Sequence, residues 1–287
     1  MTRTFLETIV NARRRLGEAG VTTPGLDAEL LLAHVLKKDR AFVLARMSET
    51  APEEVLPVFE TLVSRRSKRE PLAYITGEKE FYSRLFKVDP RVLIPRPETE
   101  GLVDAVFELY DEKSVKHALD IGSGSGAMAV TISLGRPLWR VTATDLSPSA
   151  VEVARENIFL HKVEDRVALV ESNLFDSLQD TKYDIIVFNP PYIAKASVDV
   201  DPEVERYEPA EALYSGEDGL DMIRRFTGEA PLRLEHGGHL VLEIGEGQSE
   251  AVENIIDNNK ELSLQKIARD LSGVERVFVV KKSGGDG

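Results

Sequence analysis

The chain has 287 residues, of which 42% are hydrophobic and 30% charged, a composition typical of globular proteins with enough apolar surface for one or two cores. It contains no cysteine, which excludes disulfides, thiolate zinc sites and a cysteine nucleophile. No run reaches the roughly 18 apolar residues of a membrane helix, and the N-terminal residues lack a secretory signal pattern, so we expect a cytoplasmic protein without a membrane partner.

The net charge of −13 is unevenly distributed along the chain. Residues 1–70 hold 12 Lys and Arg against 10 Asp and Glu, whereas residues 91–287 hold 21 against 36. Nonspecific nucleic-acid binding depends on basic surfaces that contact phosphates. The acidic part of the chain therefore predicts no direct nucleic-acid binding, and we expect small molecules or proteins as its partners.

Apolar residues recur at helical spacing near the N-terminus and predict helices over 3–19, 26–37 and 52–69. Because Gly, Pro and Ser/Thr residues separate these helices, they indicate a small helical domain over residues 1–75. Two basic runs, 13–15 and 64–70, favour a solvated face with cations near a helix end. A docking surface for an acidic or RNA-bound partner is the alternative.

Aromatic and β-branched runs within residues 76–100 predict a β-hairpin linker that leads into a Pro-rich turn. From residue 115 short apolar strands alternate with helices. This alternation predicts an α/β domain over residues 101–287, with a Rossmann-like, mainly parallel sheet covered by helices on both faces. The seven predicted strands are 116–122, 140–145, 166–172, 183–189, 237–245, 264–269 and 276–281, and the helices begin at 126, 148, 219 and 247.

A glycine-rich loop follows the first strand of this alternation and opens a helix. Ligands bind at the carboxyl ends of strands in such sheets, and glycines let the backbone approach them closely. Asp145 ends the next strand 19 residues after the last glycine, near the spacing at which a carboxylate accepts from ribose hydroxyls. This spacing predicts a nucleotide cofactor but does not choose its type. The loop residues are Gly122, Ser123, Gly124, Ser125 and Gly126.

The residues around this loop favour one cofactor over another. Asp120 precedes the loop, and a carboxylate there suits a cation better than a pyrophosphate, which it would repel. This favours S-adenosylmethionine, with its ammonium and sulfonium groups, over NAD. Ser172, Asn173 and Leu174 end the third strand on the same edge and are candidates to border the adenine, although an ordinary strand-to-loop turn would use the same residues.

The fourth strand ends in Asn189-Pro190-Pro191-Tyr192, where two prolines force the chain to leave the sheet in one rigid conformation. The Asn189 side-chain oxygen and the Pro190 carbonyl can accept both hydrogens of a planar NH2 group, while Tyr192 offers a flat wall. Holding a weak nucleophile in line in this way is worth up to roughly 7–11 kcal/mol, and needs no strong general base. The alternative is a turn that only caps the strand.

The chain resembles class I S-adenosylmethionine-dependent methyltransferases, and among them the protein-(glutamine-N5) methyltransferases of peptide chain release factors. The stretches that carry the resemblance are "REPLAYITGEKEF" (69–81), "LIPRPETE" (93–100), "LDIGSGSGA" (119–127), "FNPPYI" (188–193), "YEPAEALYSGEDGLD" (207–221) and "LEIGEGQ" (242–248).

This resemblance implies that the glycine loop and Asp145 bind S-adenosylmethionine, with Thr99 and Glu98 near its methionine end. It also implies that residues 189–192 hold the glutamine of a release factor's Gly-Gly-Gln motif, and that the helical domain helps to dock that protein. The family often has Asp-Trp where this chain has residues 173–174, which puts adenine stacking on Leu174 in question.

Two other functions remain alternatives at this point. The same chemistry could act on an exocyclic amino group of a nucleic-acid base, which the acidic charge disfavours. The glycine loop could instead serve an NAD-dependent or noncatalytic nucleotide-binding scaffold. We expect no metal, because His236 and His239 lack a third ligand at fixed spacing.

Overall fold

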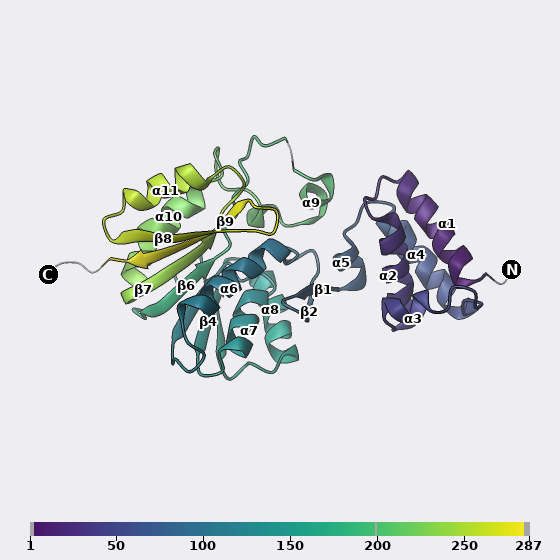
Figure 1. Ribbon diagram of the computed structural model, residues 1–287, viewed down its shortest axis with the longest axis horizontal. Helices are drawn as coiled ribbons and strands as arrows, with labels where there is room; N and C mark the ends of the chain where they lie inside the picture. Colours follow the sequence, from purple (N-terminus) through teal and green to yellow (C-terminus); the bar gives the residue numbers. More distant parts are fainter. Residues whose placement is uncertain (1–2, 199, 284–287) are drawn as a thin grey trace. The chain divides into compact units, whose positions relative to one another are not determined.

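The computed structural model describes residues 3–198 and 200–283, which form two compact units (Figure 1). One unit contains the chain up to Glu78 together with Asp201–Tyr207, and the other contains Lys79–Val200 and the chain from Glu208 onward. The segment 201–207 therefore belongs with the helical unit, although it is distant in sequence from the rest of it. The domain boundaries expected at residues 75 and 100 stay predictions.

Helices of the first unit pack around an apolar core. Thr4 begins the first helix with a capping box, in which its hydroxyl accepts from the Glu7 N–H at 3.1 Å and the Glu7 carboxylate accepts from the Thr4 N–H at 2.8 Å. The three helices predicted for this unit are present, whereas three short helices of the unit were not predicted. The described helices are α1 (Phe5–Glu18), α2 (Pro24–Leu36), α3 (Arg40–Leu44), α4 (Leu56–Arg66), α5 (Leu72–Thr76) and α9 (Pro202–Tyr207).

The two basic runs form ion pairs inside this unit. Arg15 pairs with Glu60 of α4, and Arg69 pairs with Glu203 of α9. The Tyr207 hydroxyl also donates to the Lys68 carbonyl oxygen at 2.8 Å. These contacts give the basic residues structural partners and favour the solvated-face interpretation over a docking surface.

Arg66 is buried at the centre of this network. Its Nε lies 2.6 Å from Asp27 Oδ2, with 5% of Arg66 and 3% of Asp27 exposed, and its Nη1 lies 2.9 Å from Glu203 Oε2. We expect Arg66→Leu to lower the free energy of unfolding by about 3–5 kcal/mol in urea denaturation, because Asp27 is left buried without a cation. The double variant Arg66→Leu/Asp27→Leu should lose clearly less, and an equal loss would contradict this explanation.

The second unit contains a seven-stranded sheet in the order β5-β4-β3-β6-β7-β9-β8. Within this order, β5, β4, β3 and β6 each pair in parallel with the next strand. Strand β9 pairs antiparallel with both of its neighbours, β7 and β8. The predicted Rossmann-like, mainly parallel sheet is confirmed, and β3 lies beside β6 in it. The strands are β3 (His117–Ile121), β4 (Arg140–Asp145), β5 (Val167–Glu171), β6 (Tyr183–Phe188), β7 (Leu234–Glu243), β8 (Leu262–Arg269) and β9 (Glu275–Lys282).

Alternating side chains of these strands fill two core layers, one on each face of the sheet. In β6, Ile185 and Val187 join the layer under α6, α7 and α8, whereas Ile186 and Phe188 join the layer under α10 and α11 (Figure 1). Helix α6 was not predicted, although its apolar residues recur at helical spacing. The helices are α6 (Glu100–Leu109), α7 (Ala127–Gly135), α8 (Pro148–Leu160), α10 (Asp221–Glu229) and α11 (Ser249–Asp257).

A two-stranded hairpin, β1 (Glu78–Phe81) and β2 (Arg84–Lys87), stands where the sequence predicts one. Its turn residues Tyr82 and Ser83 both have positive φ, 50° and 59°, which matches the twist of the strands it joins. Over the described ranges, no helix is both long and apolar enough to cross a membrane.

Candidate active site

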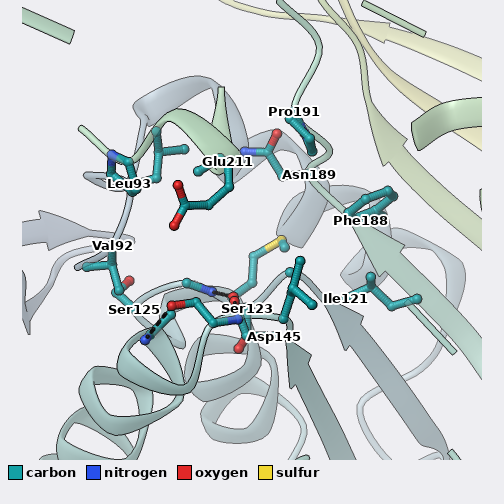
Figure 2. A pocket seen from close by; sticks show the side chains of 18 of the residues that line it. Val92, Leu93, Ile121, Ser123, Ser125, Asp145, Phe188, Asn189, Pro191 and Glu211 are labelled. Carbon is teal, nitrogen blue, oxygen red and sulfur yellow. Dashed lines mark hydrogen bonds between the residues drawn. The ribbon is translucent and has the colours of Figure 1, made fainter. Parts of the chain in front are cut away.

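The carboxyl ends of β3, β4 and β6 open into a cavity that encloses about 1110 Å³ of space continuous with solvent (Figure 2). It lies where β3 meets β6 and the strand order reverses, the usual ligand position in such sheets. In Figure 2, Asn189 and Pro191 lie on one side of the cavity, and Asp145 and Ser123 lie across it. The predicted site residues that line the cavity are Thr99, Gly122, Ser123, Gly124, Ser125, Asp145, Leu174, Asn189 and Pro191.

The glycine loop is held open by left-handed backbone conformations and by Asp145. Gly124 has a φ of 53°, and its N–H donates to Asp145 Oδ2 at 2.8 Å. The Ser147 N–H donates to Asp145 Oδ1 at 2.9 Å, so one carboxylate joins the loop to the start of α8. Burial raises the pKa of Asp145, and the two backbone donors oppose this shift. Its remaining lone pairs can accept from hydroxyl groups.

Gly126 supports the loop without lining the cavity. Its φ is 78°, and a Cβ on it would lie 3.3 Å from the Ala154 Cα and 3.2 Å from the Ala154 Cβ of α8. Glycine is therefore required there by backbone conformation and by close packing of α7 on α8. A direct contact between Gly126 and a cofactor stays a prediction.

Asp120 is fully buried beneath this loop. Its Oδ2 accepts from the Ala129 N–H at 3.0 Å, whereas its Oδ1 and the hydroxyl of Ser123 are buried polar atoms without a partner in the part of the chain that the structure describes. Burial is the main cause that raises the pKa of Asp120 to about 8. The Ser123 hydroxyl belongs to a residue that lines the cavity and can form a hydrogen bond with a ligand there, whereas Asp120 does not line the cavity.

We expect Asp120→Asn to stabilise the protein more at pH 8 than at pH 5. Because the folded-state pKa is raised, the folded protein keeps a proton that the unfolded chain releases between about pH 4 and pH 8, and wild-type stability falls as pH rises through this window. The asparagine removes that loss, which is about 1.4 kcal/mol for each pH unit within the window. Urea denaturation at both pH values measures it, and an equal effect at both would refute it.

The Asn189 side chain is tied to two buried residues through its amide nitrogen. Asn189 Nδ2 donates to Thr99 Oγ1 at 3.0 Å, and Thr99 Oγ1 donates to Glu243 Oε2 at 2.7 Å. Thr99 is 6% exposed and Glu243 is 1% exposed. Burial is the main cause that raises the pKa of Glu243 to about 7, which the Thr99 hydrogen bond and the charge of Arg276 oppose. No role was predicted for Glu243, although a carboxylate at the end of the apolar strand "HLVLE" indicates a buried polar contact.

Tyr192 and Pro190 are not among the residues that line the cavity. The Tyr192 hydroxyl is 3.5 Å from Glu243 Oε1, and its carbonyl oxygen accepts from Gln248 Nε2 at 2.9 Å. A Cβ on Gly219 would come within 2.2 Å of the Tyr192 carbonyl oxygen, so the chain packs tightly against this turn. Direct contact of Tyr192 or Pro190 with a substrate stays a prediction.

Comparison with known proteins gives matches over both units. The profile of the PrmC N-terminal domain matches residues 7–77, and that of the Methyltransferase small domain matches residues 103–206. A release factor glutamine methyltransferase from Fusobacterium nucleatum subsp. nucleatum is 40% identical over 271 residues, which cover 93% of this chain and 76% of that protein. The chain belongs to the release factor glutamine methyltransferase family.

Two further comparisons set this family assignment in context. A bifunctional methyltransferase from Rickettsia typhi is 37% identical over 94% of this chain, but the chain spans only 56% of that protein's length. The structure of the Thermus thermophilus 16S rRNA N2 G1207 methyltransferase in complex with AdoMet and guanosine aligns with a TM-score of 0.51 and 18% identity, over 72% of this chain and 50% of that one. This second likeness shows the fold alone.

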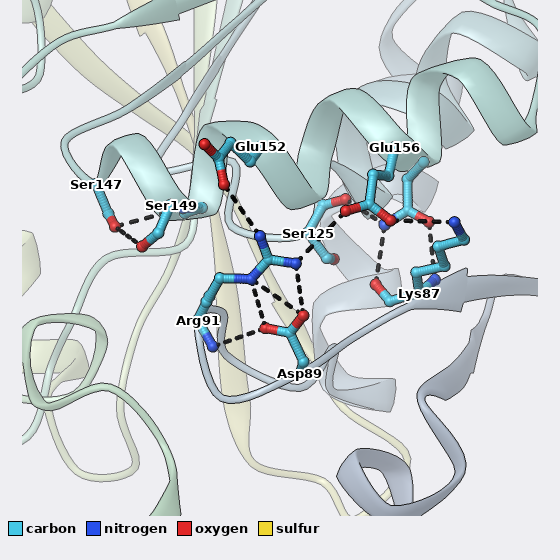
Figure 3. Close-up of polar contacts among 10 residues, drawn as sticks. Lys87, Asp89, Arg91, Ser125, Ser147, Ser149, Glu152 and Glu156 are labelled. Atoms are coloured by element: carbon cyan, nitrogen blue, oxygen red, sulfur yellow. Dashed lines mark hydrogen bonds and ion pairs between the residues drawn. The ribbon is translucent and has the colours of Figure 1, made fainter.

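In this glutamine methyltransferase family member, an arginine holds one wall of the cavity in place. Arg91 lines the cavity, and its guanidinium contacts Asp89 at 2.6 Å, Glu152 at 3.2 Å and Glu156 at 3.5 Å (Figure 3). Two of these carboxylates belong to α8. Arg91 is thereby occupied by protein partners, and it fixes the loop before "IPRPETE" against α8.

A second loop of this family member, 207–212, supplies residues that the sequence analysis did not assign. Glu208, of the "YEP" stretch, is buried and accepts from the Ile94 N–H at 3.0 Å, so it binds the two loops that border the cavity together. Glu211 lines the cavity, and Figure 2 shows its carboxylate directed into it. No spacing relative to the glycine loop or to Asn189 predicted that Glu211 would belong to the site.

Leu174 follows the third strand of the predicted alternation, at the edge where the adenine was predicted to lie. It lines the cavity, is 4% exposed and has a φ of 52°. The hydroxyl of Ser172 donates to the Leu174 carbonyl oxygen at 3.0 Å, which fixes this unusual conformation. The neighbouring Asn173 side chain accepts from Arg225 at 2.8 Å. An aliphatic side chain is therefore held rigidly where the adenine was expected.

Proposed function

We propose that this protein transfers a methyl group from S-adenosylmethionine to the side-chain amide nitrogen, N5, of the glutamine in the Gly-Gly-Gln motif of peptide chain release factors. Family membership supports the reaction class and the protein substrate. The observation that carries the proposal is Asn189, which lines the cavity with its amide nitrogen already bonded to Thr99. Its oxygen is left as an acceptor for the N–H of a substrate amide.

Residues of the cavity fit S-adenosylmethionine. When bound, it supplies a methyl group that its positive sulfur has already activated for transfer. Asp145 would accept from the ribose hydroxyls, and the glycine loop would approach the cofactor with its backbone. The AdoMet complex of the structurally similar rRNA methyltransferase agrees with this choice.

The chain's own residues would act on the substrate by orientation. The Asn189 oxygen and the Pro190 carbonyl oxygen would accept the two amide hydrogens, which aims the nitrogen lone pair and favours its localisation. Pro191 keeps that turn rigid, because its ring fixes φ and its nitrogen carries no hydrogen. The proton released after transfer can leave to solvent, so no strong general base is needed.

Release factors suit the charge of the chain better than nucleic acids do. Residues 91–287, which contain the cavity, hold 21 Lys and Arg against 36 Asp and Glu, so they repel phosphate backbones. We therefore infer direct contact with the protein substrate and none with nucleic acid or membrane. The cytoplasm, where release factors act, is the place of reaction in this proposal.

Transfer of a labelled methyl group tests this function. Purified protein is incubated with methyl-labelled S-adenosylmethionine and either unmodified release factor or a mixture of RNA and DNA. The proposal predicts label in the release factor only. Label in nucleic acid would establish the alternative substrate, an exocyclic amino group of a base. Calorimetry that detects NAD binding without S-adenosylmethionine binding would replace both with a nucleotide-binding scaffold.

A further inference from the structure

The hydrogen-bond chain from Asn189 to Glu243 has a direction. Above pH 7 the Glu243 carboxylate is mostly ionised and can only accept, so the Thr99 hydroxyl donates to Glu243 Oε2 at 2.7 Å. The lone pairs of Thr99 Oγ1 then face the Asn189 side chain. They can accept from an N–H group but offer no hydrogen to a carbonyl. Asn189 must therefore place Nδ2 toward Thr99, as observed at 3.0 Å.

Packing makes this direction difficult to reverse. Glu243 is 1% exposed at the end of β7, where it pairs with Val277 of β9. The charged and polar groups that face Glu243 are Arg276, Glu98, Tyr192 and Thr99. Turning the Asn189 amide by 180° would place its oxygen against the lone pairs of Thr99 and lose the hydrogen bond, which leaves buried polar groups unpaired.

We propose that Thr99 and Glu243 form a polarity relay that makes the site select an amide over a carboxylate. This inference rests on the proposed function and names two positioning residues for it. The relay presents the Asn189 oxygen to the cavity, so the site accepts the N–H hydrogens of a glutamine side chain. A glutamate side chain of the same shape has only acceptors at neutral pH. Its carboxylate oxygen would face the Asn189 side-chain oxygen, and no hydrogen bond could form between them.

Such a site discriminates strongly between the two substrates. A site built to hydrogen-bond a substrate N–H rejects an analogue without it by about 10⁴–10⁵ in the best cases, because its buried acceptors stay unpaired. Replacing Thr99 by valine keeps the shape and the Glu243 carboxyl, but removes the hydroxyl that holds the Asn189 amide in its orientation. The Asn189 amide is then free to turn and offer its N–H hydrogens to a carboxylate.

Binding measurements test the relay. Calorimetry at pH 8, where Glu243 is mostly ionised, gives the dissociation constants of release factor with its native Gly-Gly-Gln motif and with Gly-Gly-Glu, for protein saturated with S-adenosylhomocysteine. Wild type should prefer the glutamine form by at least about 100-fold. Thr99→Val should reduce this preference at least about tenfold, chiefly by tighter binding of the glutamate form, and should lower kcat more than it raises KM. Thr99→Ser, which restores the hydroxyl, should regain the wild-type preference.

Thr131→Val is the matched control, because Thr131 is equally buried in α7 and its hydroxyl makes no hydrogen bond within the described residues. It should keep the wild-type preference. If Thr99→Val does not fold by thermal melting, Glu243→Gln takes its place, since its amide can donate to Thr99 and reverse the relay. An unchanged preference in a folded relay variant overturns the relay. Failure of wild type to methylate the glutamine form overturns the proposed function itself.

Discussion

Asn189→Ala is expected to lower kcat for release-factor methylation by about 10²–10³-fold, the usual loss when one group that acts on the reacting centre is removed. The variant loses the acceptor that orients the substrate amide, but the glycine loop and Asp145 remain. Cofactor affinity should therefore change by less than about tenfold. Steady-state kinetics and calorimetry with S-adenosylmethionine measure the two quantities on the same preparation.

Asn258→Ala serves as the control for this variant, because Asn258 is an exposed residue at the end of α11 and does not line the cavity. Its kcat should equal that of wild type. A result in which Asn189→Ala keeps more than about a tenth of wild-type kcat would show that positioning by this amide contributes little.

Asp145→Ala is expected to weaken S-adenosylmethionine binding by about 100-fold. The carboxylate would no longer accept from the ribose, and the N–H groups of Gly124 and Ser147 would lose their acceptor. Hydrogen bonds to a charged group contribute roughly 1.5–3 kcal/mol each, so one lost ribose contact with some loosening of the loop accounts for this factor. Calorimetry measures the affinity directly.

Glu171→Ala is the matched control, since Glu171 ends the neighbouring strand in register with Asp145 but is exposed and lies outside the cavity lining. Both variants remove one acid from the end of a strand in the same sheet. Equal affinities for the two variants would mean that general electrostatics, and not a specific contact of Asp145, governs cofactor binding.

Much of the fold could be predicted from local patterns. The alternation of short apolar strands with helices predicted the parallel sheet, because the spacing of apolar residues indicates which face of a helix or strand is buried. The glycine loop and Asp145 followed from the same alternation, since both lie at carboxyl ends of adjacent strands. Helix α6 carried a clear helical period and was missed because it directly follows a Pro-rich turn.

Contacts between distant segments could not be predicted in this way. Thr99 and Glu243 are separated by 144 positions, and their hydrogen bond depends on β7 lying beside β6 in the sheet. No spacing rule relates a Pro-rich turn to the last residue of a later strand. The same holds for Glu203, which joins the helical unit through Arg66 and Arg69 from 137 and 134 positions away. Such pairings depend on tertiary packing.

The most direct test of the central claim is site-resolved mass spectrometry of unmodified release factor after incubation with the purified protein and S-adenosylmethionine. Wild type is predicted to add one methyl group at the glutamine of the Gly-Gly-Gln motif, and Asn189→Ala is predicted to leave that glutamine unmodified over the same time. A wild-type reaction that leaves this glutamine unmodified, or that methylates another residue instead, would contradict the account.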